Sequence, residues 1–201
     1  MLTVAQFWEW FKENNIAYTF LDSVEHEAKE KLLDDFLEQL HGYCDKLYFE
    51  IGGDPGDNTE LIITAAGNTD YFNKAEELIA EAPEIDRWVF IALKPPIPGH
   101  FKSEWGGLRL NTEEMWFLPL SKANSTDLGF RICLKNHDLI KNDKDLMPLL
   151  YMMLDTILGE RSAALDIKHV GIGLQPDDPK EKGMHPILDL PAYIMSHKSR
   201  S

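Results

Sequence analysis

The pattern of hydrophobic and polar positions predicts two helices at the start of the chain. Apolar residues recur at helical spacing at Val4, Phe7, Trp8 and Phe11, which predicts a helix from about Thr3 to Asn14. A second helix is predicted to begin near Asp22, with that residue as its cap. Its apolar stripe consists of Leu33, Phe36, Leu37, Leu40 and Cys44. Both stripes need an apolar surface to pack against.

Two similar groups of elements follow the helices. Residues 46–51 and 60–66 flank a turn-forming string and predict a hairpin, followed by a helix over 72–82 and a strand over 87–93. The order strand, strand, helix, strand recurs over 115–174. We therefore expect a single α+β domain over residues 1–201, with a mixed sheet of about six strands built from two ββαβ units. Its parts are a helical N-terminal segment (1–45), the first unit (46–93), a Pro/Gly-rich connection (94–114), the second unit (115–175) and a C-terminal segment (176–201).

Three strand patterns carry further expectations. The strand over 87–93 is apolar on both faces, so we expect it to be covered on both sides, with the two N-terminal helices on the second face. The strand over 128–134 alternates, which turns Arg131 and Cys133 outward. Gly171 and Gly173 share one face of the last strand and permit a close approach there.

The charge distribution disfavours one class of partner and suggests another. The chain has 201 residues and a net charge of −14, which repels phosphate backbones and disfavours direct nucleic-acid binding. Residues 1–60 hold 14 Asp and Glu against 4 Lys and Arg, so the excess belongs to the N-terminal segment. This acidity is typical of a solvated helix face, and it also suits a surface that attracts a basic protein partner.

Cysteine use and the N-terminal pattern predict a cytoplasmic protein. The first residues have no basic region and no small-residue cleavage site, so we expect no signal peptide. No stretch approaches about 18 consecutive apolar residues, so no membrane span is predicted. Cys44 and Cys133 have no metal-ligand or redox spacing and fit two unpaired thiols in a reducing compartment.

Three stretches resemble an uncharacterised family of bacterial cytosolic proteins, a domain of unknown function. They read ELIITAAG at 60–67, EAPEIDRWVFIALKPP at 81–96 and LDTILGE at 154–160. The resemblance covers roughly residues 40–175. It implies a bacterial origin and a single domain of helices and strands. The family has no assigned activity, cofactor or substrate, so the resemblance implies no site residues.

The sequence carries no recognisable catalytic or metal-binding motif. It lacks HExxH, GxSxG, GxGxxG and the phosphate-binding loop, so we expect no metal and no cofactor. His26 and Glu30 stand at i,i+4 spacing, which occurs often without metal ligation. Asp54, Asp57 and Asn58 depart from the calcium-loop spacing and predict an ordinary turn.

The long connection after residue 93 holds the best local candidates for a binding element. Pro95, Pro96 and Pro98 stiffen the backbone that presents the residues that follow. The candidates are His100, Phe101, Glu104 and Trp105. An exposed Trp105 would anchor a partner, whereas a folded-back Trp105 would cover the core, and we expect the second arrangement. Glu160 and Arg161 form a second candidate, at a strand end or as a surface charge pair after the Gly159 helix cap.

Three classes of function fit these features. The first is a protein-interaction or regulatory module, for example an acidic inhibitor that masks a basic protein such as a nuclease. The second is a small-ligand-binding domain with a pocket between the sheet and the N-terminal helices. The third is a hydrolase that uses Glu104 or Glu160 with His100, which no motif supports. We favour the first and lean against an enzyme.

Overall fold

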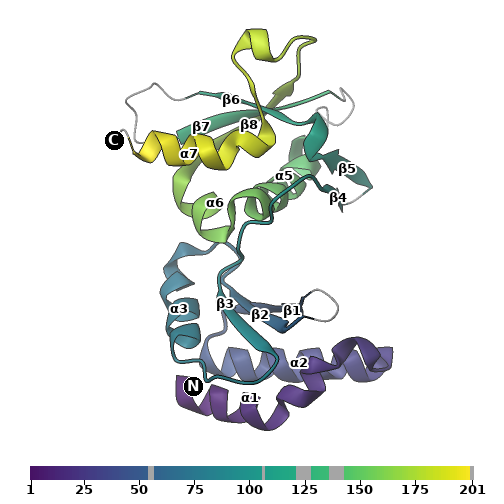
Figure 1. The fold of residues 1–201 in the computed structure, drawn as a ribbon, viewed down its shortest axis with the longest axis vertical. Coiled ribbons are helices and arrows are strands. Elements are labelled where there is room, and N and C mark those ends of the chain that lie inside the picture. Colours follow the sequence, from purple (N-terminus) through teal and green to yellow (C-terminus); the bar gives the residue numbers. More distant parts are fainter. Residues whose placement is uncertain (54–56, 106, 121–127, 136–142, 200–201) are drawn as a thin grey trace. The chain divides into compact units, whose positions relative to one another are not determined.

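The computed structural model describes residues 1–53, 57–105, 107–120, 128–135 and 143–199, and these form an α+β fold (Figure 1). The side chains of Asp22, Trp105 and residues 143–145 lie outside the description. The chain divides into two compact units, Met1–Lys94 and Pro95–Ser201. The expected single sheet of about six strands is wrong, because the described strands form three sheets of three, two and four strands.

The first unit holds a three-stranded sheet and three α-helices. Its helices are α1 (Val4–Thr19), α2 (His26–Tyr43) and α3 (Phe72–Ala80), and its strands are β1 (Tyr48–Gly52), β2 (Thr59–Thr64) and β3 (Trp88–Ala92). The strand order is β1-β2-β3. β1 and β2 form the expected antiparallel hairpin, and β2 pairs with β3 in parallel across the α3 connection. The predicted order of elements is therefore confirmed in this unit.

The N-terminal helices begin and end at residues other than those expected. α1 continues through Asn14 and Asn15, whose side chains donate hydrogen bonds back to the carbonyls of Trp10 and Lys12. It begins with a capping box between Thr3 and Gln6, which the sequence analysis did not identify. α2 begins at His26 with Glu25 at the N-cap, so the expectation of an Asp22 cap is wrong.

Aromatic side chains join α1 and α2 to one face of the sheet, as expected for the N-terminal helices. Phe36 lies 4.1 Å from Phe49 of β1 between ring centroids. Trp8 lies 4.7 Å from Phe90 of β3. The expectation that β3 is covered on both faces is wrong, because Val89 is 39% exposed and Ile91 only half-buried. The aromatic face therefore carries most of the packing of this unit.

The described residues of the second unit form a hairpin, a four-stranded sheet and three α-helices. Its strands are β4 (Lys102–Trp105), β5 (Leu108–Asn111), β6 (Trp116–Pro119), β7 (Leu128–Leu134), β8 (Ile167–Leu174) and β9 (His185–Pro186), and its helices are α5 (Asp143–Leu158), α6 (Glu160–Asp166) and α7 (Leu190–Lys198). β4 pairs with β5, and the larger sheet has the order β8-β7-β6-β9. Its core joins leucines of α5 and apolar residues of α7 to inward residues of β6 and β7.

The second predicted ββαβ unit is matched only in part. Between the parallel strands β7 and β8 the described residues form α5 and α6 in succession, because Gly159 breaks the helical run. Gly159 has φ 76° and ψ 152°, so it is a joint between α5 and α6 and not the expected left-handed cap. The predicted Pro/Gly-rich connection contains the β4–β5 hairpin, and β9 adds an edge strand.

The glycine face of β8 is occupied by a neighbouring side chain. A Cβ atom at Gly173 would lie 2.7 Å from Cδ of Arg131, so the expected close approach is made by this arginine. Arg131 is exposed, as predicted. Cys133 points to the same side but is fully buried, and this burial raises the pKa of its thiol. Within the described residues, no helix is long and apolar enough to cross a membrane.

Candidate functional site

The predicted binding loop after residue 93 is held by Thr112. Its hydroxyl lies 3.3 Å from Nδ1 of His100 and accepts a hydrogen bond of 3.0 Å from the amide of Phe101. Phe101 is half-buried against the core of the second unit, and His100 is exposed. Trp105 contributes its backbone to β4, but its side chain lies outside the described residues.

The candidate acids of this region are not arranged as a catalytic pair with His100. Glu104 accepts a 2.6 Å hydrogen bond from Nε of Arg109, its cross-strand neighbour. His100 has Thr112 as its side-chain partner. Glu160 is fully buried at the start of α6, and Arg161 beside it is exposed. The described residues show no hydrogen bond between Glu104 and His100, the contact that an acid–base pair would use.

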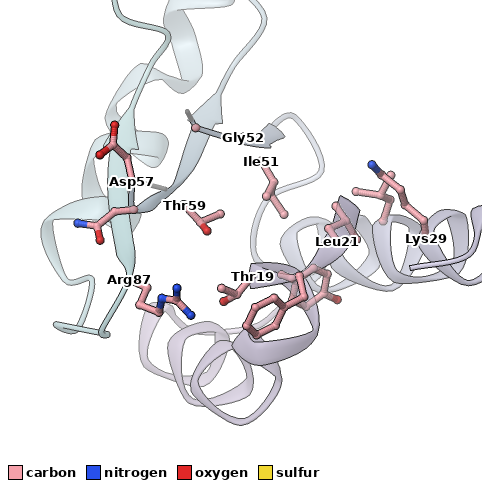
Figure 2. Close-up of a pocket in the computed structure, with 13 residues that line it drawn as sticks. Thr19, Leu21, Lys29, Ile51, Gly52, Asp57, Thr59 and Arg87 are labelled. Carbon is pink, nitrogen blue, oxygen red and sulfur yellow. The ribbon is translucent and has the colours of Figure 1, made fainter. Parts of the chain in front are cut away.

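A cleft of about 540 Å³ opens in the first unit, between the α1–α2 connection and one edge of the sheet (Figure 2). The helical wall includes Thr19, Phe20 and Leu21, and the sheet wall includes Ile51, Thr59 and Arg87. We call it the Arg87 cleft. It lies where β2 and β3 begin, whereas ligands of parallel sheets usually bind where strands end. It corresponds to the pocket expected between the sheet and the N-terminal helices.

Arg87 has an unusual backbone conformation at one end of this cleft. It stands in a turn closed by a 3.1 Å hydrogen bond from the Trp88 amide to the Ile85 carbonyl. Its φ of 67° lies in the left-handed region, which glycine adopts at the least cost. Its guanidinium carbon lies 5.8 Å from the centre of the Phe20 ring. Figure 2 shows the side chain directed toward Thr19, with the Asp57 carboxylate pointing away from it.

A shallow groove runs between α1 and α2. It encloses about 160 Å³, and its lining includes Trp10 and Tyr18 of α1 and Asp35 and Glu38 of α2. We call it the Trp10 groove. The Tyr18 hydroxyl donates a 3.1 Å hydrogen bond to the Leu32 carbonyl. Burial and then the Asp35 carboxylate raise the pKa of Tyr18 to about 12. The groove therefore combines aromatic surface with negative charge.

A wider cleft of about 930 Å³ lies near the start of the chain, but its central charges are paired with each other. Lys74 Nζ lies 2.7 Å from Glu77 Oε2, and the Tyr43 hydroxyl donates to the same oxygen at 3.2 Å. The hydrogen bond from Lys74 and its charge hold the pKa of Glu77 below its usual value. Burial and then the Glu77 charge raise the pKa of Tyr43. Lys74, Glu77 and the Tyr43 hydroxyl thus have one another as polar partners without a ligand.

Metal binding has no cluster of ligands to support it in the described part of the chain. There, no group of three or more His, Cys, Asp or Glu side chains gathers. His26 Nδ1 lies 3.6 Å from Glu30 Oε1 at the surface of α2, as their spacing allows. Asp54 lies outside the described residues, and Asp57 and Asn58 are exposed.

Three comparisons were made with known proteins. No protein family, curated protein or solved structure matches this chain. The resemblance to a bacterial domain of unknown function therefore remains a hypothesis.

The sequence pattern did not single out Trp10 or Arg87, the residues that define the Trp10 groove and the Arg87 cleft. Trp10 lies off the predicted apolar stripe of α1, and the pattern predicts Arg87 only as the first residue of a strand. The Arg87 cleft draws Thr19, Thr59 and Arg87 from three distant segments. The acidic side of α2 is the one signal that pointed toward the Trp10 groove.

Proposed function

We propose that this protein binds a basic protein partner through the acidic side of α2. This surface, the acidic α2 face, consists of Glu27, Glu30, Asp34, Asp35 and Glu38, all of which are exposed, with the exposed Lys31 on the same side of the helix. Glu30 pairs with His26. The other carboxylates have no ion pair within the described residues, so their charge is available to a partner.

The observation that carries the proposal is the position of the Trp10 groove beside this face. Asp35 and Glu38 line the groove together with Trp10 and Tyr18. A lysine or arginine side chain can place its charged head on a carboxylate and its stem against an aromatic ring. The groove therefore offers a specific contact for a basic side chain, beyond the general attraction of an acidic surface.

The competing enzyme hypothesis receives less support from the geometry. An acid–base enzyme tunes carboxylates in a shared cleft, and a general acid needs a raised pKa. The pKa values of Asp45 and Glu77 are both lowered, mainly by hydrogen bonds from Lys46 and Lys74 respectively. Each carboxylate is thus held in its charged form by an adjacent lysine.

Two further points of the proposal concern origin and setting. We place the protein in the cytoplasm, which the free thiols of Cys44 and Cys133 support. We also propose a bacterial origin, which rests on the resemblance of the three stretches described above. Neither point affects the test of the binding surface.

The test measures binding of a fluorescent peptide of alternating arginine and glycine by polarisation. The variant D34K/D35K/E38K reverses the acidic α2 face, and D177K/D178K/E181K reverses three exposed carboxylates of the second unit. Both variants change the net charge equally. We expect D34K/D35K/E38K to weaken binding at least about tenfold more than D177K/D178K/E181K. At 0.1 M salt the charges of the protein act on the peptide only within a screening length of about 10 Å, so charges near the binding surface matter most.

The contribution of the groove is tested by Trp10→Leu in the same assay. Loss of the aromatic face should weaken binding several-fold while the thermal melt shows that the protein is still folded. Equal weakening by the two charge-reversal variants would show that only the net charge attracts the peptide. Trp10→Leu that binds as well as the unchanged protein would remove the groove from the proposal.

A further inference from the structure

The Arg87 cleft is a second site, distinct from the acidic α2 face, and its charge has the opposite sign at one end. The guanidinium of Arg87 has no ion pair among the described residues, and its one recorded side-chain contact is the Phe20 ring. Figure 2 shows Lys29 at the far end of the cleft, with Thr19, Leu21 and Ile51 between. The volume of about 540 Å³ is within the range of small-molecule sites.

The conformation of Arg87 indicates that the fold alone does not explain this residue. Glycine suits its φ of 67° better than any side chain, so an arginine here makes the turn less stable. The backbone carbonyl accepts a 2.8 Å hydrogen bond from the Thr59 amide, which any residue could do. Among the described residues, the arginine side chain makes no hydrogen bond or ion pair and lies over the Phe20 ring. Ala66 and Leu93 also have positive φ, so the strain at Arg87 supports a site only together with the cleft that its side chain lines.

The walls of the cleft define the chemistry of a ligand. A guanidinium recognises carboxylate and phosphate oxygens through paired N–H donors. Apolar surface adjoins it, because Phe20 is 50% exposed and Leu33 and Ile51 are half-buried in the lining. The Thr19 hydroxyl is already engaged, since it donates to the Asn15 carbonyl and accepts from the Trp88 indole. Asp57 also lines the cleft, but its carboxylate points away from Arg87 in Figure 2, so the guanidinium and the apolar walls are the features that a small anion would contact.

We propose that the Arg87 cleft binds a small amphipathic anion, with an oxyanion head on Arg87 and an apolar body against Phe20, Leu33 and Ile51. The inference is independent of the basic-partner proposal, because the ligand carries the opposite charge and contacts different residues. A carboxylate and a phosphate ester share this head-group chemistry, and the experiment distinguishes them.

The experiment titrates the full chain with four probes and follows backbone amide shifts by NMR. The probes are phenylacetate, phenyl phosphate, inorganic phosphate and benzyl alcohol. We expect saturable binding of phenylacetate or phenyl phosphate in the millimolar range, with shifts gathered at Thr19, Thr59 and Arg87. The stronger of these two probes identifies the head group. Inorganic phosphate and benzyl alcohol should each bind at least about tenfold more weakly. Inorganic phosphate lacks the apolar body, and benzyl alcohol lacks the anionic head.

Arg87→Gly is the decisive variant, since glycine keeps the turn and removes the guanidinium. It should lower the affinity for the better probe at least about tenfold while the protein melts at or above the temperature of the unchanged chain. Arg109→Gln, an exposed arginine of the second unit, is the matched control and should bind normally. Absence of saturable binding, equal binding of benzyl alcohol or inorganic phosphate, or unchanged binding by Arg87→Gly would each overturn the proposal.

Discussion

The indole nitrogen of Trp8 donates a hydrogen bond of 2.8 Å to the carbonyl oxygen of Leu78. Leu78 lies in the last turn of α3, where backbone carbonyls have no amide four residues ahead within the helix. Trp8 thus completes the end of α3 while its ring packs against Phe90 at 4.7 Å. One side chain of α1 therefore joins α3 to β3, which makes the N-terminal helix an integral part of the first unit.

Removal of the Trp8 side chain should destabilise the first unit strongly. Trp8 is 3% exposed, and Trp8→Ala should lower the free energy of unfolding by about 3–5 kcal/mol. Trp8→Phe should cost about 1–3 kcal/mol, because it leaves the buried Leu78 carbonyl without its donor. Urea denaturation measures both. Ile16→Ala on the same helix, at a position 71% exposed, should change stability by less than about 0.5 kcal/mol. A Trp8→Ala curve that matches the Ile16→Ala curve would contradict this account.

The raised pKa of the Tyr18 phenol leads us to expect that the free energy of unfolding decreases at alkaline pH. Its pKa is raised from 10.0 to about 12, mainly by burial and then by Asp35, so folding favours the neutral phenol. The resulting stability is fully present below pH 10 and decreases as the pH rises from 10 toward 12, because the unfolded chain ionises first. Tyr18→Phe should reduce the decrease in unfolding free energy between about pH 8 and about pH 11. Parallel pH curves for the two proteins would refute the assignment.

Adjacent glycines at the end of β1 should differ sharply in their tolerance of a side chain. A Cβ atom at Gly53 would lie 2.7 Å from the carbonyl oxygen of Asn58, and its φ is 128°. Gly53→Ala should therefore destabilise the protein by about 1–3 kcal/mol. Gly52→Ala is the control, because a Cβ atom there meets nothing within 4 Å. Chemical denaturation of the two variants measures the difference, and equal midpoints would show that the loop rearranges freely.

Each compact unit should fold when it is expressed alone. Among the described residues, the buried core of the second unit is built from residues between Leu110 and Ile194. Residues 1–94 contain the aromatic cluster around Phe11 and Phe36. We expect cooperative urea unfolding and dispersed NMR spectra from both fragments, 1–94 and 95–201. A fragment without dispersed signals would show that its core depends on the other unit.

Local patterns were sufficient to predict most elements in this chain. The apolar stripe at Phe7, Trp8 and Phe11 correctly placed a buried helix face, and the turn string after residue 51 correctly placed a hairpin. These signals work because helical and strand periodicity are properties of neighbouring residues. The predicted end of α1 was wrong because a local sequence signal, the Asn pair, was outweighed by other contacts. Asn14 and Asn15 did not end α1, since both side chains bond back to carbonyls of the helix.

The candidate sites were much less predictable than the elements. The acidic α2 face was visible as a charge count, but its neighbour Trp10 was not singled out. Arg87 gave no sequence signal, because a left-handed arginine cannot be recognised without its backbone angles. The prediction around His100 and Glu104 relied on composition, whereas the structure gives each a separate partner.

The amino-acid sequence by itself determined the order of helices and strands in the first unit, the acidity of the N-terminal segment and the aromatic stripes that bury it. Only the tertiary structure decided that the strands divide among three sheets, since strand pairing depends on residues far apart in the chain. It also decided which polar residues meet. Thr19, Thr59 and Arg87 share a cleft because α1, β2 and β3 meet there, and no spacing along the sequence encodes that meeting.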